Sequence, residues 1–151
     1  MRLVLVGVLF AASALAQEGD AVRDFLKGGE MVEVARGDSW FYVDKYEVTN
    51  GEFAAFLTEK GNAKVEGVYS VEMGSRYNAL VEEEGVYGVK EGFGRHPVIE
   101  VSWYGAMAYC QWAGKRLPMQ DEWRYACEGE EQFKYPWGDV FVKGVANVFG
   151  D

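Results

Sequence analysis

The stretch that decides the fold is His96–Asp139, which reads HPVIEVSWYGAMAYCQWAGKRLPMQDEWRYACEGEEQFKYPWGD. Its apolar start, Val98 to Val101, predicts a short β-strand that leads directly into a helix. Ser102 is a favourable N-cap for that helix, and Gly114 suits a left-handed stop at its end. A strand followed so closely by a helix indicates a domain of mixed α and β structure.

Apolar residues recur at helical spacing and predict the buried faces of two helices. The buried face of the first is expected to comprise Tyr104, Met107, Ala108 and Trp112. The second, between Pro118 and Gly129, is expected to bury Trp123, Ala126 and Cys127, and a tight turn is expected at Tyr135–Asp139. We expect the tryptophans to be core aromatics rather than a ligand platform: Trp103, Trp112, Trp123 and Trp137.

An earlier segment, FYVDKYEVTNGEFAAFL at Phe41–Leu57, predicts a second strand-to-helix unit. Thr49 and Glu52 have the spacing of a capping box. The helix they open is expected to bury Phe53, Phe56 and Leu57 and to end at Gly61. Strands are expected at Met31–Val34 and Trp40–Val48, and short hairpins at Val65–Val71 and Val86–Lys90, within a glycine-rich, acidic surface excursion at 62–95.

Several separated motifs resemble one known family. The order VSW, AYC-x-WAGKRLP, EW-x-YA and YPWGD, preceded by YEVTN at Tyr46–Asn50, is similar to that of the formylglycine-generating enzyme, or sulfatase-modifying factor, family. The resemblance covers roughly Trp40–Asn147 and corresponds to the front half of the family's domain. It implies an α+β fold of the C-type-lectin-like, sulfatase-modifying factor type, which we expect to be incomplete in this chain.

The amino terminus predicts export. Residues 1–16, MRLVLVGVLFAASALA, combine a basic start, an apolar run and a small-x-small cleavage site, as in a secretory signal peptide. We therefore expect a signal peptide at 1–16, an N-terminal lead-in at 17–39, and the N-terminal part of a sulfatase-modifying-factor-like domain at 40–151. The expected location is secreted or periplasmic. No membrane span is expected after signal removal, because the apolar run is too short to cross a bilayer comfortably.

The formal net charge of −9 argues against nucleic acid as a partner, because neutralising phosphates requires a basic surface. An acidic surface instead favours solubility and the approach of cationic ions or peptides. By resemblance, the expected partner is a protein or peptide substrate.

Cys110 and Cys127 are the two cysteines of the chain. In the family, a catalytic cysteine pair binds copper and activates oxygen, which oxidises a substrate cysteine to formylglycine, and soft thiolates suit Cu(I). That pair belongs to the second half of the family's domain, so no catalytic or cofactor-binding residue is assigned here. Cys110 and Cys127 instead match positions that form structural disulfides with later cysteines in some relatives. They are expected to be either unpaired or bridged to each other, and a bridge needs Cα atoms within about 7 Å.

The resemblance also implies a structural calcium ion. In the family, the asparagine of an Ala-Asn pair and the carbonyl of the next residue supply oxygens to calcium, and here these residues are Asn147 and Val148. Calcium takes about six to eight oxygens, so these residues form at most part of a site. A turn asparagine satisfied by the backbone is the alternative for Asn147.

Smaller predictions concern His96, Lys115–Arg116 and Met119. His96 precedes Pro97, which favours an extended backbone, and a single histidine is a weak catalytic candidate. Lys115–Arg116 is expected to be a solvated or carbonyl-bonding pair between the helices. Met119 stands where relatives usually have a capping threonine, so the cap it shares with Glu122 is expected to be weaker by about 1 kcal/mol.

Together these observations predict a secreted protein with a sulfatase-modifying-factor-like domain that lacks the catalytic half in this chain. The resemblance implies a copper- and oxygen-dependent oxidoreductase as the parent enzyme, and this chain alone is expected to be inactive. The alternative is a non-catalytic C-type-lectin-like module for binding or assembly. An iron-dependent chemistry, as in the related sulfoxide synthases, ranks last because it needs several histidine ligands and His96 is the only histidine.

Overall fold

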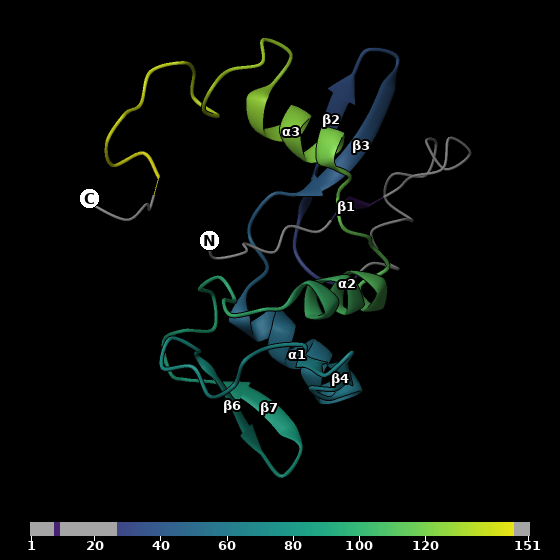
Figure 1. The fold of residues 1–151 in the computed structure, drawn as a ribbon, viewed down its shortest axis with the longest axis vertical. Helices are drawn as coiled ribbons and strands as arrows, with labels where there is room; N and C mark the ends of the chain where they lie inside the picture. The colour runs from purple at the N-terminus through teal and green to yellow at the C-terminus, as the bar shows by residue number, and fades with distance from the viewer. Residues whose placement is uncertain (1–7, 10–26, 147–151) are drawn as a thin grey trace. The chain divides into compact units, whose positions relative to one another are not determined.

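The computed structural model describes residues 8–9 and 27–146 (Figure 1). Most of the predicted signal peptide at 1–16, and the expected calcium ligands Asn147 and Val148, lie outside the described residues. The chain divides into two compact units, Met1–Leu117 and Pro118–Asp151, and each is described by itself. Helices and short antiparallel strands mix in the described part, in agreement with the predicted α+β class. No helix within residues 8–9 and 27–146 is long and apolar enough to cross a membrane.

The first unit begins with an antiparallel hairpin of β2 (Met31–Arg36) and β3 (Ser39–Asp44). Gly37 lies in its turn at φ +58°, in the left-handed region that tight hairpin turns require. β1 (Val8–Leu9) pairs with β3, so that the strand order is β1-β3-β2. β3 ends at Asp44 rather than at the predicted Val48, because its pairing with β2 ends where Met31 meets Asp44.

α1 (Asn50–Lys60) starts at the predicted capping box. The Thr49 hydroxyl accepts a hydrogen bond from the Glu52 amide at 3.3 Å, and the Glu52 carboxylate accepts one from the Thr49 amide at 2.8 Å. Both bonds satisfy amides at the helix start that no preceding turn can satisfy. The predicted buried stripe is confirmed: Phe53, Phe56 and Leu57 are all buried. The predicted end is confirmed at Gly61, whose φ is +74°.

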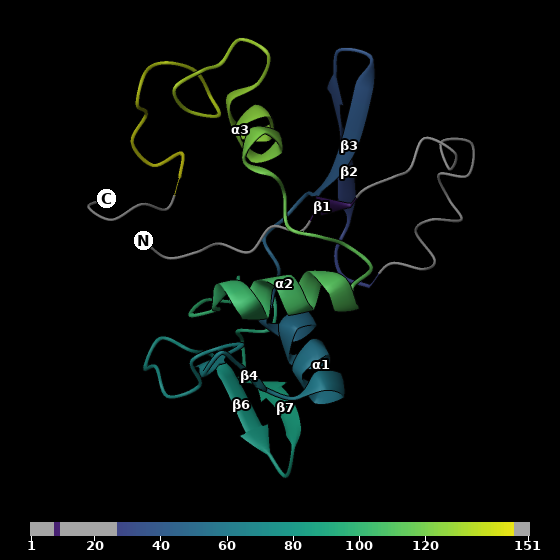
Figure 2. The same ribbon diagram turned by 45° about the vertical axis from the view of Figure 1, so that its right-hand side comes forward.

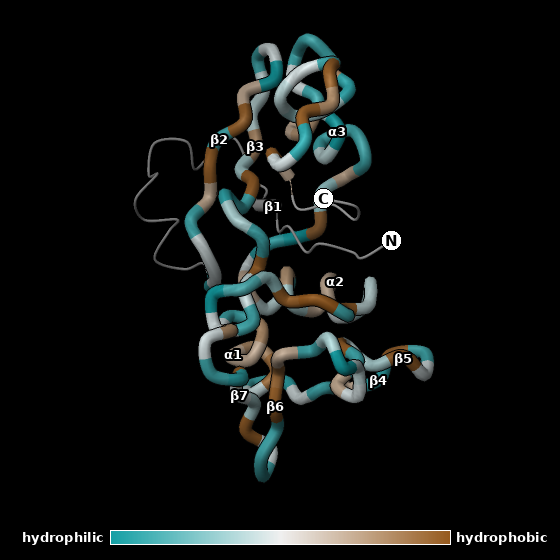
Figure 3. Tube along the Cα trace, turned by 90° about the vertical axis from the view of Figure 1, so that its left-hand side faces the viewer, coloured by the Kyte–Doolittle hydropathy of each residue, from teal (hydrophilic) through white to brown (hydrophobic). Residues whose placement is uncertain are grey.

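Two antiparallel hairpins follow α1. β4 (Lys64–Val65) pairs with β5 (Val68–Tyr69), and β6 (Leu80–Glu83) pairs with β7 (Val86–Val89). Each is closed by a Glu-Gly turn with positive φ at both residues, the pattern of a type I′ turn. The first hairpin confirms the prediction, whereas the range predicted for the second contains only its returning strand. The tip of β6 and β7 is hydrophilic, as expected of a surface excursion (Figure 3).

α2 (Trp103–Trp112) starts, as predicted, at Ser102, whose hydroxyl accepts from the Gly105 amide at 3.0 Å. The predicted buried face of this helix is only partly correct: Ala108 and Trp112 pack, partly buried, against the core, but none of the four predicted residues is fully buried. Its buried residues are Gly105, Ala106, Tyr109 and Cys110. The helix approaches the preceding chain so closely that a Cβ on Gly105 would lie 2.1 Å from the Ser70 carbonyl oxygen. Only glycine therefore fits at position 105, where the helix meets that backbone.

The strand predicted at Val98–Val101 is not formed as regular structure. Val98 and Val101 are buried, but the stretch makes an isolated bridge instead, between Val101 and Val71. The Val98 amide donates to the Val48 carbonyl at 2.9 Å, which ties this stretch to the segment before α1. The apolar pattern therefore predicted the burial of Val98 and Val101 correctly, but it did not predict correctly that they form a regular strand.

The core of the first unit lies between α1 and α2, which cross in Figure 2. The Phe53 ring stacks on Tyr109 with centroids 5.5 Å apart. Phe56 meets Phe53 and Tyr109 edge-on, at 5.2 and 5.8 Å. Buried aliphatic residues surround these rings: Val48, Leu57, Val71, Leu80, Val98 and Val101. This aromatic cluster fixes the two helices that carry the site described below.

The second unit contains α3 (Gln120–Glu128). As predicted, Met119 makes no side-chain cap hydrogen bond, while the Glu122 carboxylate accepts from the Met119 amide at 2.7 Å. The predicted inward face is wrong, because no residue of α3 is buried. The predicted turn is confirmed by backbone hydrogen bonds in both directions between Tyr135 and Gly138, each 3.0 Å long.

The expectation that all four tryptophans are core residues is therefore only partly correct. Trp112 and Trp137 are half-buried. Trp103 and Trp123 are 56% and 54% exposed. Helical spacing alone did not show which side of each helix packs against the rest of its unit and which adjacent side stays exposed.

Candidate functional site

A buried ion pair joins two segments far apart in the sequence. Lys115 Nζ donates to Asp44 Oδ1 at 2.5 Å, and only 1% and 3% of the two side chains are exposed. The prediction of a solvated Lys115 is therefore wrong. Its neighbour Arg116 does bond a carbonyl as predicted, that of Leu117 at 2.9 Å. Burying a charged side chain costs free energy unless an opposite charge lies beside it, so Lys115 and Asp44 each need the other to remain charged in the interior.

The Tyr109 hydroxyl belongs to the same buried polar cluster. It has no hydrogen-bond partner among the described residues, although the side chain is fully buried. Burial, and then the negative charges of Glu52 and Asp44, raise the pKa of Tyr109, so the hydroxyl stays protonated. Gly28 covers the cluster: a Cβ at this position would lie 3.0 Å from the Tyr109 hydroxyl and 3.1 Å from Lys115 Nζ. Only glycine fits there without displacing one of these groups.

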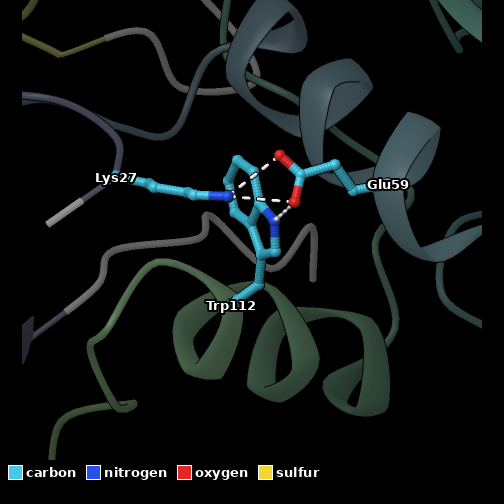
Figure 4. Close-up of polar contacts among 3 residues, drawn as sticks. All are labelled: Lys27, Glu59 and Trp112. Atoms are coloured by element: carbon cyan, nitrogen blue, oxygen red, sulfur yellow. Dashed lines mark hydrogen bonds and ion pairs between the residues drawn. The ribbon is translucent and has the colours of Figure 1, made fainter. Parts of the chain in front are cut away.

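Lys27, immediately before Gly28, is held by both helices (Figure 4). Its Nζ donates to both Glu59 carboxylate oxygens at 2.9 Å and lies 4.4 Å from the centroid of the Trp112 ring. The Trp112 indole N–H donates to Glu59 Oε2 at 2.8 Å. Hydrogen bonds from Trp112 first, and then from Lys27, lower the pKa of Glu59. The Lys27 amide donates to the Ala113 carbonyl at 3.2 Å, so the backbone is anchored as well.

Both cysteines are free thiols in the structure. Cys110 is fully buried in α2, and burial, with a smaller contribution from Asp44, raises its pKa to about 12. Cys127 of α3 is half-buried, and burial followed by the Glu128 charge raises its pKa as well. They belong to different units, and a bridge between them stays a prediction.

These thiols do not fit the copper chemistry implied by the family. Copper(I) binds thiolates, and a pKa of about 12 keeps the Cys110 sulfur protonated at neutral pH. In the described part of the chain, no group of three or more histidine, cysteine, aspartate or glutamate residues could hold a metal ion. The calcium expectation at Asn147 and Val148 concerns residues outside the described range.

Comparison with known proteins decides the family. Residues 17–151 match the family described as the sulfatase-modifying factor enzyme 1-like domain. The chain belongs to this family. The resemblance recognised in the sequence motifs is thereby confirmed, and the match includes residues 17–39, which were expected to form a lead-in. No solved structure matches the chain significantly.

Curated relatives of this sulfatase-modifying-factor-like domain carry different names. The chain is 35% identical to formylglycine-generating enzyme from Bos taurus over 125 residues, 66% of this chain and 33% of the relative. It is 36% identical to serine/threonine-protein kinase pkn1 from Chlamydia caviae over 110 residues, 72% of this chain and 18% of the relative. It is 43% identical to inactive C-alpha-formylglycine-generating enzyme 2 from Bos taurus over 63 residues, 41% of this chain and 21% of the relative. The chain thus spans a third or less of the length of these relatives.

Asn50, in the YEVTN motif of this sulfatase-modifying-factor-like domain, contacts the start of the second motif-bearing stretch, which begins at His96. Asn50 is 2% exposed, and its Nδ2 donates to the carbonyls of Phe93 and His96, each at 3.1 Å. His96 therefore serves through its backbone, while its ring lies 5.0 Å from the Phe93 ring. The asparagine connects the start of α1 to the loop that leads into α2.

Sequence reasoning missed most of the polar site on this domain: Lys27, Asp44, Glu59 and Tyr109 were not singled out. The pair Gly28–Gly29 is typical of the end of a helix, but glycine also permits a close backbone approach. That glycine pair was the available signal. Nothing local pairs Asp44 with Lys115, because 71 positions separate them.

Proposed function

We propose that this chain forms the front part of a secreted or periplasmic sulfatase-modifying-factor-like domain with a C-type-lectin-like fold. It resembles the enzyme that oxidises a substrate cysteine to formylglycine, but this part supplies scaffold rather than copper ligands. By resemblance, the family's catalytic cysteines belong to the second half of its domain, whereas the motifs of this chain correspond to the front half. The observation that carries the proposal is Cys110, a protonated thiol with a pKa of about 12, sealed in the core.

Calcium at Asn147 and Val148 is part of the same proposal. Amide and carbonyl oxygens are ligands that calcium accepts, and the remaining ligands would come from outside this pair. A ligand that binds only the folded state raises its apparent stability. Calcium should therefore raise the thermal midpoint of the chain, and Asn147→Ala should remove that increase. An unchanged midpoint at millimolar calcium would refute this part of the proposal.

The alternative function, binding or assembly without catalysis, is favoured by the surface of the second unit. Its exposed apolar side chains are Met119, Trp123, Phe133, Val140, Phe141, Val142 and Val145. Exposed apolar surface of this extent is typical of interaction sites, and a protein or peptide partner would cover it. The similarity to a relative whose name includes the word inactive supports a non-catalytic role.

One experiment separates the two functions. The purified chain is incubated with a cysteine-containing peptide, copper(I) and oxygen, and the aldehyde product is followed by mass spectrometry. We expect no aldehyde above the level without protein. Aldehyde that appears with the wild type and disappears with Cys110→Ala would overturn the scaffold proposal. Peptide binding without conversion, measured by calorimetry on the same samples, would favour the binding module.

A further inference from the structure

We propose that α1 and α2 carry a recognition site for a Lys–Gly step of a polypeptide, and that the chain's own Lys27–Gly28 occupies this site. The site consists of Trp112, Glu59 and the carbonyl of Ala113, with the Tyr109 hydroxyl and Lys115 Nζ beneath. The proposal rests on side-chain geometry in the first unit and is independent of the proposed function.

The ammonium group is the first feature that the site recognises. Lys27 Nζ lies above the Trp112 ring and donates to both Glu59 oxygens, so a cation–π contact and charge-assisted hydrogen bonds act on one group. Trp112 is held independently of Lys27, because its ring lies 5.8 Å from Phe56 and 5.7 Å from Tyr109. Its N–H also orients Glu59. Residues of the helices therefore pre-organise the ammonium site.

The backbone and the glycine are the second and third features. The Lys27 amide donates to the carbonyl of Ala113, at the end of α2, where carbonyls lack partners within the helix. Gly28 has φ +100°, and a Cβ there would meet the Tyr109 hydroxyl at 3.0 Å and Lys115 Nζ at 3.1 Å. Lys115 cannot move away easily, because it is paired with buried Asp44. The residue after the lysine must therefore be glycine.

The external occupant is a Lys–Gly segment of another polypeptide. The formal net charge of −9 favours the approach of cationic segments. Lys27 and Glu59 are 47% and 51% exposed, so their ion pair is weak and exchangeable. A tethered internal lysine competes with external peptide through its high effective concentration. Removing the Lys27 side chain should therefore free the ammonium part of the site, formed by Glu59 and Trp112, while the backbone of residues 27 and 28 stays in place.

The test uses the full chain and the peptide acetyl-Lys-Gly-Gly-amide, which copies residues 27–29. Lys27→Ala should bind it about tenfold more tightly than the wild type, measured by ligand-observed NMR. Adding Glu59→Gln or Trp112→Phe to Lys27→Ala should remove the gain. The matched control is Lys45→Ala, which removes another exposed lysine, paired with Glu30 at 3.1 Å, and should bind like the wild type.

Two results would overturn the proposal. The first is equal peptide binding by Lys27→Ala and the wild type. The second is equal binding of acetyl-Ala-Gly-Gly-amide and acetyl-Lys-Gly-Gly-amide by Lys27→Ala, because recognition of the ammonium group would then be absent. If Lys27→Ala does not fold, acetylation of Lys27 is compared in the wild type and Glu59→Gln. Severalfold faster modification in Glu59→Gln supports internal occupancy, and equal rates refute it.

Discussion

Lys115 donates to Asp44 inside the first unit, so the loop that follows α2 is tied to the last residue of β3. Neither side chain reaches solvent to a significant extent. The Tyr109 hydroxyl and the backbone of Gly28 lie against the same pair. An isolated buried charge is far more costly than a buried pair, so this contact places a strong constraint on how β3 and α2 can be arranged.

Breaking the Asp44–Lys115 pair should therefore be severe. Asp44→Leu leaves Lys115 buried without a counter-charge, and the free energy of unfolding should fall by about 3–5 kcal/mol in urea denaturation. Asp44→Leu combined with Lys115→Met should recover most of the loss, because no charge remains buried. Lys45→Ala, which breaks an exposed pair, is the control and should cost less than about 1 kcal/mol. A single Asp44 variant as stable as this control would contradict the assigned role.

Restoring an N-cap should stabilise α3. In Met119→Thr a hydroxyl can accept the amide bond that methionine leaves unmade, and the local gain should be about 1 kcal/mol. Slower hydrogen exchange of the first-turn amides of α3 is the measurement. Thr49→Ala is the matched opposite change, since it removes an existing cap from α1 and should cost a similar amount. Unchanged exchange in Met119→Thr would contradict the prediction.

The two cysteines should differ in reactivity. Iodoacetamide at pH 8 should label Cys127, which is half-buried, while Cys110 should react only after denaturation. The pKa of Cys110 is raised from the ordinary value of 9.0 to about 12. Its contribution to stability is therefore complete below pH 9.0 and is lost as pH rises towards 12. The measurement is mass spectrometry of the labelled peptides. Equal labelling of Cys110 and Cys127 in the native protein would contradict the burial of Cys110. A protein that takes up no label and has a mass lower by two hydrogens would contain the Cys110–Cys127 disulfide.

Acid should release the contact between Glu59, Trp112 and Lys27. The pKa of Glu59 lies below its ordinary value of 4.5, so the contact contributes stability above that pH and loses it as pH falls through the lowered pKa. Thermal midpoints of the wild type and Glu59→Gln should therefore converge between pH 6 and about pH 3. A constant difference across that range would show that ionised Glu59 does not stabilise the fold.

Predictions from the sequence succeeded where the interaction is local. Both helix starts with a capping hydroxyl, at Thr49 and Ser102, were correctly located because each cap bonds an amide three residues away. They were only partly correct for the buried face of α2, since the close approach of Gly105 to Ser70 depends on a chain segment 35 positions earlier. The copper and calcium expectations came from resemblance alone, and the calcium expectation stays a prediction because Asn147 and Val148 lie outside the described residues.

The sequence by itself determined the family, the helix boundaries and the stripe of Phe53, Phe56 and Leu57, because motif order, caps and periodicity are properties of neighbouring residues. Only the tertiary structure decided that Lys115 is buried with Asp44, that Trp103 is exposed, and that Lys27 rests on Trp112 and Glu59. Each of these outcomes depends on contacts between distant segments, whose energies arise only after the helices pack and exclude water.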